Sequence, residues 1–373
     1  NGNLKAIINN EAKEKIISCR KKVEIITKND KVVYGINTGF GPLCDVQISP
    51  EETNQLQKNL LITHAVGVGN NIDKQLSKLM MICKVHALCQ GFSGVRLELI
   101  ERIIYFIENN LLPTVPELQA KEGLGLINGT QFILAHTITG LLKMEYLLDL
   151  ADISGAMSIE GYKGSSSPFR EELHRIRPFK GSIKVAERMR NLFKDSQNIT
   201  SHENCERVQD PYSMRCIPQV HGASRNAFYH LLELAEIEMN SVTDNPIVLS
   251  ETEAISGGNF HGQPLAMALD YCSIAASELG NIADRRCYLL LEGKYGLPRL
   301  LTKSGGLNSG FMIPQYTTAA LVTENKSLCF PPSADSIPTS LGQEDHVSMG
   351  SISGRQFNQI LGNLEKILAI ELM

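Results

Sequence analysis

Residues 261–292 read HGQPLAMALDYCSIAASELGNIADRRCYLLLE, and this stretch decides the fold. Apolar residues recur in it at helical spacing, which predicts one long helix. At about 1.5 Å per residue such a helix would be about 45 Å long. Helices of this length pack into bundles, and such bundles often associate side by side. We therefore expect a mainly α fold built as an elongated helical bundle.

Other parts of the chain repeat the same helical pattern, and strand signals are few and short. Further helices are expected at 11–26, within 51–110 with a break at 91–94, and at 130–158, 223–242, 312–330 and 351–372. Two proline-punctuated segments, 164–178 and 209–219, are expected to be loops, and TDNP at 243–246 is a turn signal. We predict an N-terminal α+β head domain over residues 1–125 and a long-helix bundle domain over 126–373.

The composition is that of an ordinary globular protein, with 43% apolar and 20% charged residues among 373. The net charge is −4 and positive charges are dispersed, which disfavours a nucleic-acid or anionic-membrane partner. No membrane-spanning stretch or signal peptide is recognisable, so a cytoplasmic protein is expected. Nine cysteines without a CxxC pair predict free, mostly buried thiols and no metal site.

The loop YGINTGFG at 34–41 is the most distinctive segment. Its glycines let the backbone approach a ligand closely, although a tight turn would use them equally well. Phosphate binding is disfavoured because no lysine follows at the required spacing. Tyr34 could act as a general base if positive charge lies nearby, whereas a tyrosine beside a turn more often only packs.

Four other motifs carry polar groups that could serve chemistry. In QDPYSMRC, the Arg215 fork suits a substrate carboxylate, but an ordinary salt bridge would explain it as well. TENK places Glu324 inside an apolar helix, where a carboxylate needs a partner such as a cation or a ligand. The acids of EDHVSMG, beside His346, could simply cap the last helix, and the histidine of THAVGVG could be structural.

Taken together, ten segments in this order resemble the aromatic amino acid ammonia-lyases from about residue 4 to the last residue. They are YGINTGFG, NLLITHAVGVG, GFSGVR, EGLGLINGTQ, ERVQDPYSMRCIPQVHG, TDNP, GGNFHG, GLNSGFMIPQ, TENK and QEDHVSMG. The resemblance implies a fold of the fumarase/aspartase-like superfamily. It also implies a homotetramer with shared active sites and an electrophilic 4-methylidene-imidazol-5-one ring formed from an internal Ala-Ser-Gly.

The resemblance also implies roles for individual residues. Tyr34 matches the base that takes the β-proton, and Thr63 with His64 matches the pair against the substrate ring. Arg215 matches the arginine that pairs with the substrate carboxylate. The remaining matches are Asn128 near the prosthetic group and the substrate amine, Gln209 and Tyr212 lining the site and supporting the electrophile, Phe260 beside the prosthetic ring, and Glu324 as an acid typical of histidine-specific members.

The substrate prediction depends on Glu324 and His64. A carboxylate suits an imidazole, which can donate a hydrogen bond or carry positive charge, and it suits a phenyl ring poorly. Elimination of ammonia from L-histidine to trans-urocanate is therefore expected. Tyrosine-specific relatives also use a histidine at the 63–64 pair, so tyrosine is the second choice.

One feature departs from the family pattern, because no Ala-Ser-Gly occurs in the chain. In relatives a few dozen residues holding this tripeptide would lie between Glu117 and Leu118. Either the sequence omits a segment that the protein carries, or the deletion is real and the protein is a catalytically inactive homologue. Intact substrate-facing loops favour the first interpretation. A fumarase-like lyase, which needs no such ring, is disfavoured because GSSSPF at 164–169 lacks the following Met, Lys and Asn of that group.

Overall fold

The computed structural model describes residues 5–28, 32–49, 51–64, 67–118, 129–202 and 207–373. The chain forms two compact units, each assembled from three separate stretches. The first unit comprises 1–138, 234–266 and 333–351, and the second comprises 139–233, 267–332 and 352–373. The first unit thus contains the N-terminal residues together with two segments that lie far along the sequence.

The first unit has a small helical core. Its helices are α1 (Asn10–Ile26), α2 (Thr53–His64), α3 (Lys74–Cys89) and α4 (Leu97–Glu108). Isoleucines repeat along one face of α4 and pack against α1 and α3, which buries Ile100 completely. A second cluster joins α1 to the strand residue Val248 through Val23 and Ile26. These apolar contacts bring the 234–266 segment into the unit.

Two short antiparallel sheets complete the first unit. Strand β1 (Val68–Asn71) pairs with β2 (Pro116–Leu118), with Val68 opposite Leu118. Strand β3 (Ile247–Val248) pairs with β4 (Ala254–Ile255). A 3₁₀ turn, η1 (Gly41–Leu43), packs against another, η5 (Ser340–Gly342). The packing of η1 against η5 joins the 333–351 segment to the end of the YGINTGFG loop.

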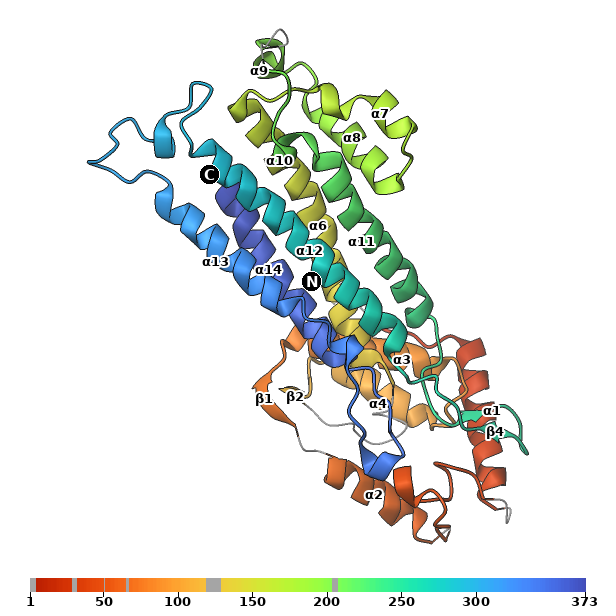
Figure 1. Ribbon diagram of the computed structural model, residues 1–373. Helices are drawn as coiled ribbons and strands as arrows, with labels where there is room; N and C mark the ends of the chain where they lie inside the picture. Colours follow the sequence, from red (N-terminus) through yellow and green to blue (C-terminus); the bar gives the residue numbers. More distant parts are fainter. Residues whose placement is uncertain (1–4, 29–31, 50, 65–66, 119–128, 203–206) are drawn as a thin grey trace. The chain divides into compact units, whose positions relative to one another are not determined.

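The second unit contains parts of five long helices that run side by side (Figure 1). They are α6 (Gln131–Tyr162), α11 (Ile217–Met239), α12 (Gln263–Leu290), α13 (Met312–Leu328) and α14 (Gly350–Leu372). Shorter helices are α7 (Glu171–Arg175), α8 (Lys180–Leu192), α9 (Gln197–Thr200) and α10 (Tyr212–Arg215), with 3₁₀ turns η2 (Ser167–Phe169), η3 (Arg299–Leu301) and η4 (Pro332–Ala334). Among the described helices, none combines the length and apolar character that a membrane crossing requires.

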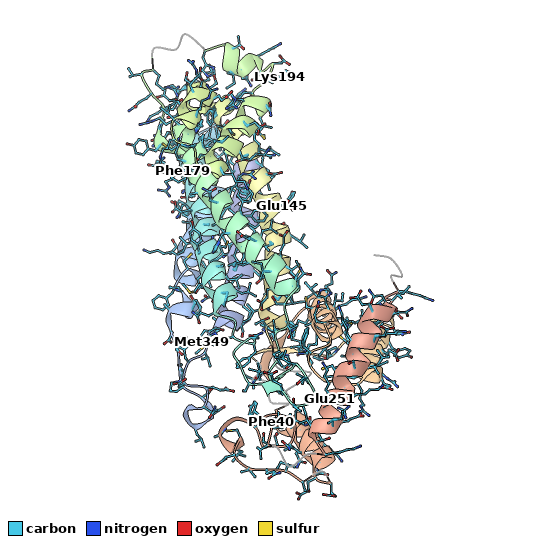
Figure 2. All side chains as sticks on the ribbon, turned by 90° about the vertical axis from the view of Figure 1, so that its right-hand side faces the viewer. Phe40, Glu145, Phe179, Lys194, Glu251 and Met349 are labelled. Carbon is cyan, nitrogen blue, oxygen red and sulfur yellow. The ribbon has the colours of Figure 1, made fainter. Side chains whose placement is uncertain are left out.

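Periodicity along the sequence explains the bundle's packing. On α6, Met144, Leu147 and Leu148 are buried, whereas Glu145 is exposed and points away from the bundle in Figure 2. Helices approach closely where glycine removes a side chain. A Cβ on Gly222 of α11 would lie 2.5 Å from the backbone nitrogen of Ser182 in α8. A side chain at this contact would force the two helices apart.

A buried ionic network links the bundle's helices. Asp152 of α6 accepts hydrogen bonds from Nδ1 of His221 at 2.9 Å and from Nη2 of Arg225 at 2.5 Å. Arg286 of α12 forms a bidentate pair with Glu371 of α14, and both side chains are fully buried. Such pairs specify which helices are neighbours, because a buried charge without its partner is costly.

The structure confirms the mainly α bundle and its long helices, with three differences. Helix α12 covers 28 residues, fewer than the thirty-two of the quoted stretch. The predicted loop 164–178 contains η2 and α7, and the predicted loop 209–219 contains α10 and the start of α11. Proline caused the last two errors, because it is compatible with the first turn of a helix as well as with a loop.

The described cysteines are all free, as expected, but fewer are buried than predicted. Three are buried, namely Cys19, Cys272 and Cys287, and the other described ones are half-buried. Burial raises the pKa of the Cys287 thiol to about 12 and that of Cys83 to about 11. These thiols therefore remain protonated near neutral pH, and Cys205 lies outside the described residues.

Candidate active site

Tyr34 lies in a loop that closes on itself. Its hydroxyl oxygen accepts a hydrogen bond from the backbone N–H of Gly41 at 3.3 Å. Gly35 and Gly41 both have positive φ, at 73° and 57°, which explains why glycine occupies these positions. The backbone of Gly41 thus provides a hydrogen-bond donor for the Tyr34 hydroxyl. No cationic partner of Tyr34 is found among the described residues.

The other predicted residues of the first unit are only partly described. Thr63 is exposed near the end of α2, and its hydroxyl donates to the carbonyl of Asn59 at 2.9 Å. Phe260 is half-buried just before α12. His64 is the last residue of α2, but its side chain lies outside the described part of the chain, as does all of Asn128.

The EDHVSMG segment, whose acids could have capped the last helix, follows a turn that packs against the end of the Tyr34 loop. Glu344 follows η5, which packs against η1 of that loop, and it accepts a hydrogen bond from the Thr339 hydroxyl at 2.9 Å. The first N–H of α14, on Gly350, is bonded to Ser348, and the recorded partner of the Glu344 carboxylate is Thr339. The motif EDHVSMG had marked the segment, but only tertiary structure shows which loop it meets.

Two histidines join the Phe260 segment to the Glu344 segment. The rings of His261 and His346 are stacked with centroids 5.5 Å apart, and Nε2 of His261 lies 3.3 Å from the carbonyl oxygen of His346. His261 directly follows Phe260, and His346 lies two residues after Glu344. The first unit therefore brings the GGNFHG and EDHVSMG motifs together.

In the second unit, the structure brings Tyr212 and Arg215 together. The guanidinium carbon of Arg215 lies 4.5 Å from the centre of the Tyr212 ring, and its Nε donates to the carbonyl of Asp210 at 2.9 Å. Gln209 is exposed beside them, and Tyr212 is 72% exposed. The three-residue spacing places Tyr212 and Arg215 on one turn of helix, as the sequence suggested.

Glu324 differs from expectation in its burial. It is exposed on α13, where its Oε2 accepts a hydrogen bond from Nδ2 of Asn363 on α14 at 2.8 Å. The apolar residues around Glu324 occupy other faces of the helix, so its carboxylate needs no buried cation. Among the described residues, no group of side chains could hold a metal ion.

The predicted residues are distributed over both units. Tyr34, His64, Thr63 and Phe260 belong to the first, whereas Gln209, Tyr212, Arg215 and Glu324 belong to the second. Within the described residues, Tyr212 and Arg215 are the only pair of these with a direct contact that the structure records.

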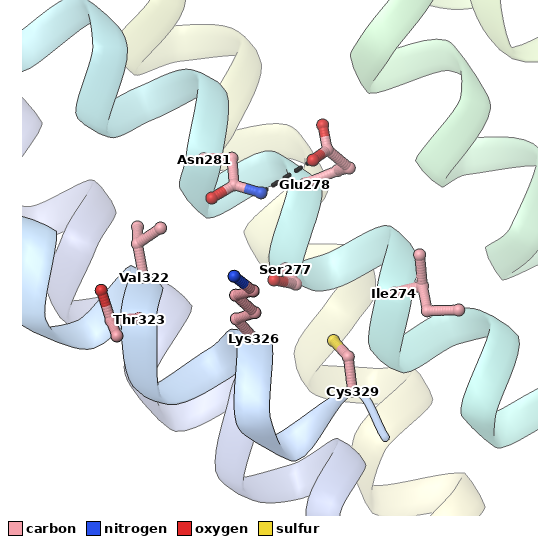
Figure 3. A pocket seen from close by; sticks show the side chains of 8 residues that line it. All are labelled: Ile274, Ser277, Glu278, Asn281, Val322, Thr323, Lys326 and Cys329. Carbon is pink, nitrogen blue, oxygen red and sulfur yellow. Dashed lines mark hydrogen bonds between the residues drawn. The ribbon is translucent and has the colours of Figure 1, made fainter. Parts of the chain in front are cut away.

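Two hollows in the described structure lie away from these residues. One, of about 240 Å³, lies between α12 and α13, and Figure 3 shows Lys326 extending toward Ser277 and Asn281 across it. The amide of Asn281 donates to Glu278 at 2.7 Å along its edge. The other, of about 420 Å³, lies in the first unit beside α1 and α3. Neither is lined by a predicted site residue.

Comparison with known proteins gives the class of protein that this fold and these motifs define. The family model "Aromatic amino acid lyase" matches residues 1–117 and 116–373, so the chain belongs to the aromatic amino acid lyase family. The chain is 42% identical to a histidine ammonia-lyase of Natranaerobius thermophilus, over 98% of this chain and 82% of that protein.

Solved structures agree with this assignment. A histidine ammonia-lyase from Trypanosoma cruzi is 37% identical, with a TM-score of 0.87, and the match covers 98% of this chain and 78% of that one. A tyrosine aminomutase from Streptomyces globisporus is 30% identical, with a TM-score of 0.91, covering 98% and 82%. The same fold therefore occurs in proteins that are named for different amino acids.

The comparisons also place the departure from the family pattern. The two matched pieces of the family model meet at residues 116–117. The alignment with the Natranaerobius protein spans 417 positions, more than the 373 residues of this chain. Relatives thus contain residues that this chain lacks, and the break in the family match falls where the sequence predicted it.

Proposed function

We propose that this protein is built for the histidine ammonia-lyase reaction, the elimination of ammonia from L-histidine to trans-urocanate. The observation that carries the proposal is its 41–42% identity, over 98% of the chain, to several curated histidine ammonia-lyases. Positioned groups support it, because Tyr34 is fixed by Gly41 and Arg215 is fixed by Asp210.

Each predicted site residue has a task in this proposal. Arg215 pairs with the substrate carboxylate through its two terminal nitrogens, since its Nε is already bonded to Asp210. Tyr34 accepts the β-proton at its hydroxyl oxygen. Thr63 and His64 contact the imidazole, Phe260 provides an aromatic wall, and Gln209, Tyr212 and Asn128 line the site.

Two carboxylates are candidates for recognising the imidazole. Glu324 remains the prediction from the motif TENK, although its Oε2 is bonded to Asn363. Glu344 has the advantage that its segment packs against the loop of the proposed base, Tyr34. Loss of either acid should weaken histidine binding if that acid meets the ring. Comparing the affinities of E324Q and E344Q for L-histidine therefore shows which acid recognises the imidazole.

The prosthetic group of the family does not fit the residues of this chain. The ring would form from Ala-Ser-Gly, and no such tripeptide occurs in the 373 residues. The family match breaks at residues 116–117 and the alignment with the Natranaerobius relative is longer than this chain, so the presence of the segment in the protein stays a prediction. No step of the elimination is therefore assigned to the ring.

An insertion experiment tests the function. The 373-residue chain should give an intact mass near 41.1 kDa and no urocanate absorbance from L-histidine. Inserting a relative's tripeptide segment between Glu117 and Leu118 should give, after ring formation, a mass two waters below that of the unprocessed inserted chain, one lost on cyclisation and one from the serine side chain. The inserted chain should also produce urocanate from L-histidine. A ring that forms without any turnover of histidine would refute the proposal, and coumarate from tyrosine would select the tyrosine-specific alternative.

The absent tripeptide favours a second candidate function for the chain as it stands, namely an amino-acid-binding protein of the lyase fold without turnover. It predicts measurable binding of L-histidine by the 373-residue chain and no release of ammonia. Ammonia release by this chain alone would exclude that alternative and would require another electrophile.

A cytoplasmic homotetramer with shared sites completes the proposal. Exposed apolar side chains follow one face of α6, with Leu142, Tyr146 and Met157 each more than half exposed. Apolar patches of this kind mark protein–protein contacts. Light scattering should give a mass about four times that of the chain, and a monomer at micromolar concentration would contradict the assembly.

A further inference from the structure

Asp210 is a buried carboxylate that neither the motifs nor the comparisons assign to any task. Its side chain is 3% exposed and lies one residue after Gln209 and two before Tyr212. A carboxylate in this environment must be paired and hydrogen-bonded. Its contacts therefore indicate what the buried charge holds in place.

The Asp210 side chain fastens its loop to the end of α6. Oδ2 accepts the backbone N–H of Ser165, three residues beyond α6, at 2.6 Å. Oδ1 accepts a hydrogen bond from Nη1 of Arg207 at 2.5 Å. Both oxygens are thus engaged, one by the loop after α6 and one by an arginine of its own loop, so the position of residue 210 is fixed.

Arg207 is itself held by two aromatic rings. Its guanidinium carbon lies 3.5 Å from the ring centre of Tyr295 and 5.0 Å from that of Tyr162. These rings meet edge to face with centroids 4.8 Å apart, and Tyr162 is almost fully buried. Cation–π contacts at a desolvated site are strong enough to restrain a guanidinium. Arg207, which donates to Oδ1 of Asp210, is therefore itself restrained.

The main chain of Asp210 transmits this position to Arg215. Its carbonyl oxygen accepts Nε–H of Arg215 at 2.9 Å, while the Arg215 guanidinium lies over the Tyr212 ring at 4.5 Å. The two Nη groups of Arg215 have no other partner within the described residues. They form a fork that is oriented in advance for a carboxylate.

We propose that Asp210 is a positioning residue, which aligns Arg215 for the carboxylate of an α-amino acid ligand through the chain Arg207–Asp210–Arg215. The inference rests on the proposed function, in that Arg215 is the residue that meets the carboxylate. An arginine that is already immobilised loses less rotamer freedom when it binds, so its alignment strengthens binding. Asp210 itself need not touch the ligand.

Isothermal titration of the 373-residue chain with two ligands tests the inference. L-histidine has the carboxylate that Arg215 would meet, and histamine has the same imidazole without it. The variant D210N should weaken L-histidine binding by about tenfold, the effect of a misaligned charged hydrogen bond. Histamine binding should stay the same. In the R215A background, D210N should have no further effect on L-histidine.

The controls separate positioning from folding. E172Q removes an exposed ion pair with Arg170 in the same unit and should change neither affinity. R207K retains the charge but not the planar stacking on Tyr295, and it should give a smaller, equally carboxylate-selective loss even where D210N fails to fold. Equal losses for L-histidine and histamine would overturn the inference.

A crystal structure of D210N, or of R207K, gives a readout that does not depend on the ligand. Arg215 should leave the Tyr212 ring, and an unmoved Arg215 would overturn the inference. If the wild-type chain binds neither ligand, the proposed function fails while this structural comparison still decides the role of Asp210.

Discussion

Glu371 provides the sharpest test of how the bundle is stabilised. Its carboxylate accepts four hydrogen bonds in the interior, two on each oxygen. Ser154 and Ser158 of α6 donate at 2.7 and 2.8 Å, and Arg286 of α12 donates from Nε and Nη2. The side chains of Glu371 and Arg286 are both fully buried. One residue near the end of α14 thus connects three helices.

The substitution E371Q keeps the shape but removes the charge. One acceptor oxygen becomes an NH₂ group that faces donors, and the Arg286 guanidinium remains buried without a counter-charge. Breaking a buried pair by removing one partner costs about 3–5 kcal/mol. We therefore expect the free energy of unfolding to fall by about that amount.

Urea unfolding followed by far-ultraviolet circular dichroism measures this loss, at one fixed protein concentration because assembly contributes to stability. The matched control is E365Q on the same helix, where Glu365 pairs with Lys143 of α6 at 2.6 Å in a half-exposed position. An exposed pair is worth at most about 1 kcal/mol. If E371Q were no more destabilising than E365Q, the network would not hold the bundle together.

Two further predictions concern the same unit. Burial lowers the pKa of His221, and this effect outweighs the opposing effect of Asp152. The folded state therefore keeps His221 neutral, whereas in the unfolded chain this histidine becomes protonated below its usual pKa of about 6.5. Stability should therefore fall with pH below about 6.5, by at most about 1.4 kcal/mol per pH unit, and urea titrations of H221Q should lack this contribution. Thermal melting should show G222A destabilised by about 1–3 kcal/mol, because its Cβ would meet Ser182. The variant G362A has open space around the new Cβ and should be stabilised by about 0.5–1 kcal/mol. Equal effects of the two variants would contradict the close-packing argument.

The long helices were predictable because their signal is local. The apolar spacing of 261–292 needs no knowledge of distant residues, and α12 follows it closely. The short helices α7 and α10 were not predicted because proline beside them suggested loops and because four or five residues give too few repeats for periodicity to be seen. The sequence also could not predict which segments form the first unit. Val23 and Val248 share one apolar cluster there, although they are far apart in sequence.

The candidate site was predictable in part for the same reason. Spacing alone brought Tyr212 and Arg215 onto one turn, and the structure confirms their contact. Glu324 was misjudged as buried because neighbours in sequence do not reveal which helix face meets the core. Asp210 was not singled out, and the partner of Glu344 was not predicted, because partners such as Arg207 and Thr339 are identified only by the fold.

The match to the family model breaks at residues 116–117, beside the small β1–β2 sheet of the first unit. Position 117–118 lies in β2, which pairs with β1, and among the described residues neither strand belongs to the apolar cluster around Ile100 or to the one around Val23. Those clusters are built from α1, α3, α4 and residues near Val33 and Val248. A segment inserted at 117–118 would therefore extend from a small sheet without displacing either cluster. The insertion experiment consequently tests the chemistry with little risk to the fold, and a failure would count against the proposed reaction.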